Sequence, residues 1–135
     1  NIYDGTKLVL LGTGTPNACP NASGPSSAVV VGDRAYLDDF GPGVVRQAAK
    51  ATNEGIDSSP RTRLMIAFCT HLHTDHTTGY PDLIFTPWVL ERPKPLKVFG
   101  PKALFINLKK QGYYKFACKI TKRITSIAFT PSFFF

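Results

Sequence analysis

Several features that define common protein classes are missing from this 135-residue chain. No apolar run approaches the roughly 20 residues that cross a bilayer, so we expect a soluble protein without a membrane partner. The cysteines (Cys19, Cys69 and Cys118) lie far apart without a Cys-x-x-Cys spacing, which argues against a disulfide framework and a cysteine-rich zinc finger. Residue 1 is Asn and no basic, apolar leader precedes it, so any targeting peptide is expected outside this sequence and the compartment is left open.

Acidic residues are absent from the last third of the chain. Residues 1–91 carry six Lys or Arg and all nine Asp and Glu, whereas residues 92–135 carry ten Lys or Arg and no acid. Formal charges of −3 and +10 follow, and so uneven a distribution needs an explanation. One explanation is a nucleic-acid-binding arm in which aromatic residues stack on bases, namely Phe105, Tyr113, Tyr114 and Phe116. We favour the other, a segment without evolved function whose composition is typical of translated non-coding or frame-shifted sequence, because the charges are scattered and form no recognised motif.

Short apolar runs separated by glycine and proline predict an α/β fold. The predicted strands cover residues 7–11, 28–31, 35–37, 64–69 and 96–99. The first is expected to be buried, and residues 64–69 (LMIAFC) suit a strand buried on both faces. One helix is expected to pack through Val44, Val45, Ala48 and Ala49. A second begins near Pro81, with Pro87 ending or kinking it. Residues 12–27 predict a long loop, residues 55–60 a linker, and residues 103–110 a short helix.

All three histidines of the chain lie within six residues, in His71-Leu72-His73-Thr74-Asp75-His76. Neutral imidazole is the commonest metal ligand in proteins, and carboxylate completes many sites. At a strand end, residues two apart point the same way, so His71 and His73 can bind one ion. The chain then turns toward a helix, which lets Asp75 and His76 face a second ion. Two adjacent ions suit hydrolysis because they activate water and stabilise developing charge, so we prefer a metal site to a polar loop that happens to contain histidine.

The segment Thr70–Gly79 resembles the His-x-His-x-Asp-His signature of the metallo-β-lactamase-fold hydrolases. Leu10–Pro16 (LLGTGTP) is similar to the opening strand and glycine turn of that superfamily's ribonuclease Z and arylsulfatase-like branch, and Tyr36–Gly41 (YLDDFG) to its Asp-x-Gly element. Tyr80–Leu83 and Val98–Pro101 also resemble segments of this branch, so the resemblance covers about residues 7–101. A phosphate-binding role for Gly12-Thr13-Gly14 is disfavoured, because no Gly-x-Gly-x-x-Gly pattern follows and no helix is expected there.

The resemblance implies a metal site and a fold. It places His71 and His73 at a first zinc ion and Asp75 and His76 at a second, with Asp75 also orienting or deprotonating the attacking water. Asp39 would support the metal loops, although an ordinary turn aspartate is the alternative. No substrate-binding residue is identified. The implied fold is the first half of an αββα sandwich, a mixed β-sheet with outer helices. We therefore divide the chain into the N-terminal half of a metallo-β-lactamase-like domain (residues 1–101) and an unplaced tail (residues 102–135).

The resemblance also implies that this chain lacks part of the family's site. Family members complete it with a third histidine, a bridging aspartate and a last histidine, yet no histidine follows His76 and no acid follows Glu91. The expected activity is zinc-dependent hydrolysis of a small-molecule ester, a sulfate ester or a phosphodiester, with transfer-RNA 3′-end processing as the alternative. We expect this chain itself to be inactive, to hold one zinc ion weakly or none, and to self-associate through an uncovered sheet face. A non-catalytic truncated product or a basic nucleic-acid-binding fragment are the remaining alternatives.

Overall fold

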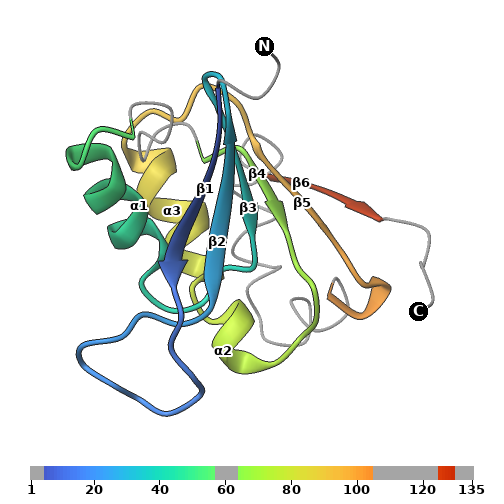
Figure 1. Ribbon diagram of the computed structural model, residues 1–135. Helices are drawn as coiled ribbons and strands as arrows, with labels where there is room; N and C mark the ends of the chain where they lie inside the picture. Colours follow the sequence, from blue (N-terminus) through green and yellow to red (C-terminus); the bar gives the residue numbers. More distant parts are fainter. Residues whose placement is uncertain (1–4, 57–63, 105–124, 130–135) are drawn as a thin grey trace.

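The computed structural model describes residues 5–56, 64–104 and 125–129. The strands in these ranges form one mixed six-stranded sheet (Figure 1). Its spatial order follows the chain order: β1 (Thr6–Gly12), β2 (Ser26–Val31), β3 (Arg34–Asp38), β4 (Ile66–Phe68), β5 (Leu96–Gly100) and β6 (Thr125–Phe129). The pairs β1–β2 and β2–β3 are antiparallel, whereas β3, β4, β5 and β6 run parallel. This mixed sheet confirms the predicted fold class.

Two longer helices cover the same face of the sheet. Helix α1 (Val44–Asn53) connects β3 to β4, and α3 (Tyr80–Val89) connects β4 to β5, after the single turn of α2 (Thr74–Thr77). Parallel crossovers are almost always right-handed, which places successive helices on one side of a sheet. Figure 1 shows α1 and α3 side by side there, and Arg46 Nη1 of α1 lies 2.8 Å from Asp82 Oδ2 of α3. The predicted mixed sheet with outer helices is therefore confirmed.

The core lies between the helices and one face of the sheet. Its most fully buried side chains are Val30, Leu37, Phe40, Val44, Leu64, Leu83, Pro87, Leu96 and Val98. On α1 the buried face includes Ala51, whereas Ala49 is only half-buried, which corrects one position of the predicted helix face. On α3 the buried positions Tyr80, Leu83, Ile84 and Pro87 recur at helical spacing.

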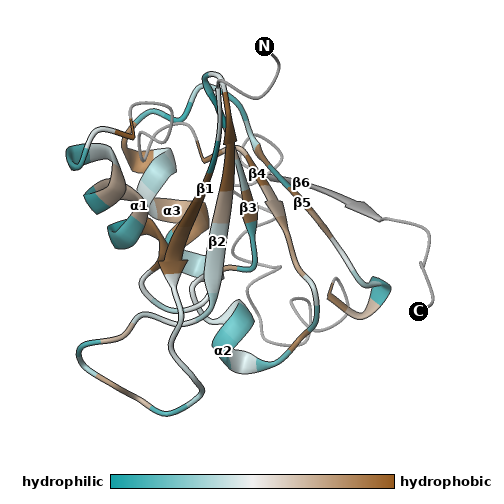
Figure 2. Ribbon diagram, viewed as in Figure 1, coloured by the Kyte–Doolittle hydropathy of each residue, from teal (hydrophilic) through white to brown (hydrophobic). Residues whose placement is uncertain are grey.

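The opposite face of the sheet carries exposed apolar side chains, which corrects two predictions of burial. Leu8 and Leu10 of β1 are 69% and 65% exposed, because this strand lies at the sheet edge and alternate residues point away from the helices. In β4, Ala67 is fully buried whereas Phe68 is 39% exposed, so this strand is covered on one face only. Figure 2 shows hydrophobic residues along β1 and β4. This exposure is what an uncovered sheet face requires; self-association itself stays a prediction.

Helix α3 continues through Pro87 for two more residues, to Val89. Its end has the hydrogen bonds of a Schellman motif: Arg92 N–H donates to Pro87 O (2.9 Å) and Glu91 N–H donates to Trp88 O (2.9 Å). Glu91 supplies the left-handed residue of this motif, with φ of 63°. Pro87 therefore does not end the helix, and the predicted kink at this residue stays a prediction. Trp88, on the outer side of the helix, is 44% exposed.

Part of the tail after residue 101 is described. Strand β6 pairs in parallel with β5, from Leu96 opposite Thr125 to Gly100 opposite Phe129. The linker at residues 55–60 and the short helix at 103–110 lie mostly outside the described residues, as do Cys118 and the four aromatic residues of the proposed nucleic-acid arm. The domain boundary and that arm therefore stay predictions. Within the described ranges, no helix is both long and apolar enough to span a membrane.

Candidate metal centre

The histidine cluster lies directly after β4, and Asp39 lies directly after β3. Because these neighbouring strands are parallel, their carboxyl ends meet at one edge of the sheet, where ligands of open α/β sheets commonly bind. The backbone holds the two segments together: Phe40 N–H donates to His76 O and Gly79 N–H donates to Phe40 O, each at 3.0 Å. The sheet topology therefore brings together residues more than 30 positions apart in the sequence.

His71 and His73 present ring nitrogens to one another. The distance from His71 Nε2 to His73 Nδ1 is 3.1 Å. Two imidazole nitrogens bound to a tetrahedral zinc ion at about 2.0–2.1 Å lie about 3.3–3.4 Å apart. The spacing of these two nitrogens therefore suits a shared ion.

Asp75 and His76 form a second pair beside the first. Asp75 Oδ2 lies 3.7 Å from His76 Nε2, and the rings of His71 and His76 are 4.1 Å apart between centroids. The side chain of Asp75 is only 9% exposed, and its Oδ1 atom is buried without a hydrogen-bond partner among the residues that the structure describes. Such an atom in a native protein needs an explanation, and a cation is one that its charge favours. The residues present therefore fit a metal centre.

Asp39 contacts Thr70 and the Nδ1 atom of His76 rather than the ring nitrogens that face one another in the pair of His71 and His73. Its Oδ1 accepts the Thr70 backbone N–H at 2.8 Å, and its Oδ2 accepts from Thr70 Oγ1 at 2.8 Å and from His76 Nδ1 at 2.6 Å. One ligand atom each of Asp39, His71 and His76 also lie within 4.8 Å of one another, so this trio is an alternative ligand set among the described residues. We prefer the supporting position, because both Asp39 oxygens already accept hydrogen bonds.

Glycine is required where the two segments approach each other. A Cβ atom added at Gly79 would lie 2.2 Å from Gly41 O and 2.7 Å from Phe40 O, and one added at Gly41 would lie 2.5 Å from Asp75 O. All of these neighbours are backbone atoms that cannot move aside cheaply. Asp39, just before this contact, adopts a left-handed conformation with φ of 57°, which costs energy for a residue other than glycine.

The region behind the histidines disfavours further negative charge. Burial, followed by the nearby Asp39 carboxylate, raises the pKa of the Cys69 thiol to about 12. Its Sγ atom lies 3.0 Å from His71 O, as a thiol that donates to this carbonyl. Burial and then Asp39 also raise the pKa of Asp38 above its usual range. Cys69 is therefore a buried neutral thiol, as expected from its apolar surroundings in the sequence.

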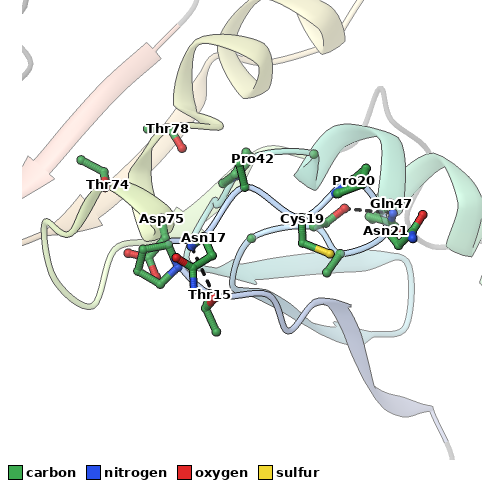
Figure 3. A pocket seen from close by; sticks show the side chains of 16 residues that line it. Thr15, Asn17, Cys19, Pro20, Asn21, Pro42, Gln47, Thr74, Asp75 and Thr78 are labelled. Atoms are coloured by element: carbon green, nitrogen blue, oxygen red, sulfur yellow. Dashed lines mark hydrogen bonds between the residues drawn. The ribbon is translucent and has the colours of Figure 1, made fainter.

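A pocket of about 710 Å³ opens beside Asp75 (Figure 3). One wall is the loop after β1, from Thr15 to Gly24, and the other comes from Pro42, Gly43, Gln47, Thr74, Asp75 and Thr78. Figure 3 shows Asp75 and Asn17 near one another at one end, with Cys19, Asn21 and Gln47 toward the other. Among the described residues, Asp75 is the one carboxyl group that lines the pocket, and no Lys or Arg lines it. The predicted long loop thus contributes an uncharged wall of mixed polar and apolar side chains next to the candidate metal centre.

The structure adds residues that sequence reasoning did not single out. Thr70 contacts both Asp39 and His71, and Gly41 and Gly79 permit the close backbone approach. The only sequence signal for these residues is that they stand at the ends of the two segments that carry the family resemblance. Gly12 and Gly14 pack against the returning arm of their loop, where Gly14 N–H donates to Ser23 O at 2.8 Å, and no helix begins there. The structure is thus in line with the rejection of a phosphate-binding glycine loop.

The chain is similar in sequence to curated ribonucleases Z. It is 38% identical over 98 residues to ribonuclease Z of Mycobacterium avium (strain 104), an alignment that covers 70% of this chain and 33% of the relative. It is 35% identical over 111 residues to ribonuclease Z of Pyrococcus horikoshii, covering 80% of this chain and 34% of the relative. The chain therefore spans about a third of the length of the curated relatives that it matches. No protein-family model matches it.

Solved structures with a similar fold include human tRNase Z, short form, with a TM-score of 0.70 and 21% identity over 93% of this chain and 45% of that one. The metallo-β-lactamase fold protein YhfI from Bacillus subtilis has a TM-score of 0.68 and 19% identity over 95% of this chain and 48% of that one. At these identities the likeness concerns the fold. In both comparisons the chain corresponds to about half of the solved structure.

Proposed function

Because the chain is a metallo-β-lactamase-fold protein related in sequence to ribonuclease Z, we propose that it carries the first half of a zinc-dependent phosphodiesterase that acts on RNA. The observation that carries the proposal is the convergence of two imidazole nitrogens, 3.1 Å apart, in the same segment as a buried Asp75 oxygen that has no hydrogen-bond partner among the described residues. The relatives' name favours the phosphodiester, and hence an RNA partner, over the ester and sulfate ester of our first expectation. Arylsulfatase-like activity stays a prediction.

Zinc is the metal we propose, because imidazole and carboxylate are among its usual ligands. His71 and His73 would hold one ion, and Asp75 and His76 would hold a second. Bound zinc supplies activation of water and neutralisation of charge on the phosphoryl group. Asp75 Oδ1 is placed to accept a proton or a positive charge, since no donor of the described residues contacts it. The neighbouring pocket would take the uncharged part of the substrate, because its described lining combines hydroxyl and amide side chains with apolar ones and includes no Lys or Arg.

We further propose that the 135-residue chain is inactive by itself. Each candidate ion has two ligands here, whereas a catalytic zinc site commonly has three protein ligands and an open position. The sequence contains no histidine beyond these three and no acid after Glu91. Zinc should accordingly bind more weakly than at a complete site. The missing ligands would have to come from another polypeptide segment.

Zinc titration calorimetry tests the metal assignment. The double variant His71→Ala, His73→Ala should bind zinc at least about tenfold more weakly than the wild-type chain, because it removes both nitrogens of one pair. Asp33→Ala is the matched control, since Asp33 is an exposed carboxylate on the β2–β3 hairpin, and it should bind zinc as the wild type does. Equal zinc binding by the double variant and the wild type would contradict the assignment.

Phosphodiester turnover tests inactivity separately. With zinc supplied, the wild-type chain should hydrolyse an RNA substrate no faster than the double variant. Strong zinc-dependent hydrolysis that Asp75→Ala abolishes would show that the ligands present suffice and would refute the proposed inactivity.

A further inference from the structure

The hydroxyl group of Thr70 lies between the Asp39 carboxylate and the His71 ring. Thr70 Oγ1 is 2.8 Å from Asp39 Oδ2, 3.0 Å from Asp39 Oδ1 and 2.9 Å from His71 Nδ1. The Asp39 side chain is only 8% exposed, so the carboxylate end of this contact is shielded from bulk water, whereas Thr70 itself is exposed. Asp39 therefore holds Thr70 through both its backbone N–H and its hydroxyl.

The number of available protons sets the direction of these hydrogen bonds. A carboxylate only accepts, so the single Thr70 hydroxyl proton points to Asp39. The Thr70 oxygen can then face His71 only as an acceptor, which requires the proton of the neutral His71 ring on Nδ1. His71 Nε2 is left with a free lone pair, and it is this atom that lies 3.1 Å from His73 Nδ1.

We propose that Thr70 is a positioning residue that holds the His71 ring with Nε2 unprotonated and turned toward the metal position. The inference rests on the proposed zinc-binding function and adds a role for a residue that contacts no ion itself. Asp39 reaches His76 directly, at 2.6 Å, but contacts His71 through the Thr70 hydroxyl. One carboxylate thereby orients two imidazoles, because the hydroxyl extends its reach.

His73 differs from His71 in this arrangement. Because the His71 Nε2 lone pair faces His73, His73 Nδ1 carries a proton in the metal-free chain. It donates a hydrogen bond to His71 Nε2. His73 is exposed, so this proton can move to the outer nitrogen when an ion takes its place. The position of the proton is thus fixed on the His71 ring and can change on the His73 ring. Loss of the Thr70 hydroxyl should therefore weaken zinc binding, because it removes the group that fixes the His71 ring.

Long-range ¹H–¹⁵N spectra of the metal-free chain test this directly, because only three histidine rings contribute signals. The spectra are recorded at about pH 8, where imidazole is ordinarily neutral. The variants are Thr70→Val, which keeps the shape and removes the hydroxyl, and Thr70→Ser, which restores it. Thr77→Val is the control: Thr77 Oγ1, at the end of α2, donates to His73 O at 3.0 Å and forms no hydrogen bond with a histidine ring among the described residues. Zinc affinity is measured on each variant by calorimetry.

We expect His71 to be protonated at Nδ1 in the wild type, Thr70→Ser and Thr77→Val, and to lose this preference in Thr70→Val. Zinc affinity should fall about tenfold in Thr70→Val alone, as when other partners of ligating histidines are removed. A wild-type His71 unprotonated at Nδ1 would overturn the proposal without any variant, and so would wild-type zinc affinity in a folded Thr70→Val chain. If the wild type bound no zinc, the proposed function would fail, while the metal-free spectra would still decide the role of Thr70.

Discussion

Arg92 replaces a hydrogen bond that Pro87 removes from the interior of α3. Proline has no N–H, so the Leu83 carbonyl, four residues earlier, loses its helical donor. The Arg92 guanidinium donates to Leu83 O at 2.9 Å and to Ile84 O at 3.2 Å, and the residue is only 8% exposed. Burial lowers the pKa of Arg92 to about 10, so the group still carries its charge at neutral pH. We expect this contact to explain how the helix accommodates its proline.

The predicted cost follows from this geometry. Arg92→Met keeps the length of the side chain but leaves the buried Leu83 carbonyl without a donor in the described part of the chain. An unsatisfied buried carbonyl costs about 1–3 kcal/mol, so we expect a loss of about 2–3 kcal/mol in the free energy of unfolding. Pro87→Ala supplies the missing N–H, and in that background Arg92→Met should cost about 1 kcal/mol. The coupling between the two positions is therefore expected to be about 1–2 kcal/mol.

Urea denaturation of the wild type, both single variants and the double variant, followed by circular dichroism, measures this coupling. The cycle cancels the packing that Pro87→Ala removes, because that loss occurs in both backgrounds. If Arg92→Met costs the same within about 0.5 kcal/mol whether residue 87 is proline or alanine, the reasoning is refuted.

Two further predictions concern cysteine reactivity and backbone approach. At about pH 8, mass-spectrometric mapping of maleimide-treated protein should find exposed Cys19 modified and Cys69 unmodified until the chain unfolds. The reason is that a pKa of about 12 leaves roughly one Cys69 thiol in 10⁴ ionised. Equal labelling rates for the two cysteines would contradict this prediction. Gly79→Ala should lower stability by about 2–3 kcal/mol in thermal denaturation, because its Cβ would lie 2.2 Å from Gly41 O, whereas Gly5→Ala, whose nearest neighbour is 4.0 Å away, should be nearly neutral. An unchanged melting temperature for Gly79→Ala would show that this backbone contact can relax.

Local sequence patterns predicted most of the fold because they act over a few residues. The hairpin between β2 and β3 turns at Gly32, whose φ of 58° glycine adopts readily, and the helix at Val44–Asn53 shows its apolar spacing directly. Burial of β1 could not be predicted in this way. An apolar run does not reveal whether its strand lies at an edge or which face is covered, and Leu8 and Leu10 are exposed for that reason.

In the candidate site too, local features could be predicted from the sequence and contacts between distant segments could not. Its four histidine and aspartate residues could be grouped from the sequence because they lie within six consecutive positions. The contact between Asp39 and His76 spans 37 positions, and it could be anticipated only from resemblance to a family. The Thr70 hydroxyl and the Arg92 guanidinium were beyond prediction, because their roles depend on side-chain direction and on which backbone donors are missing.

The order of strands in the sheet has a consequence for how the protein forms during synthesis. Every strand from β2 to β6 pairs with the strand that precedes it in the chain, so no pairing has to wait for a distant segment to arrive. Closing short loops costs less entropy than closing long ones, so the antiparallel pairs β1–β2 and β2–β3 can form before the parallel pairs, whose connections are longer. As the chain leaves the ribosome, β3 and the Asp39 turn can be in place before β4 and the histidine loop emerge. The Asp39 carboxylate, which orients His71 and His76, can therefore be positioned before these two histidines are synthesised and folded.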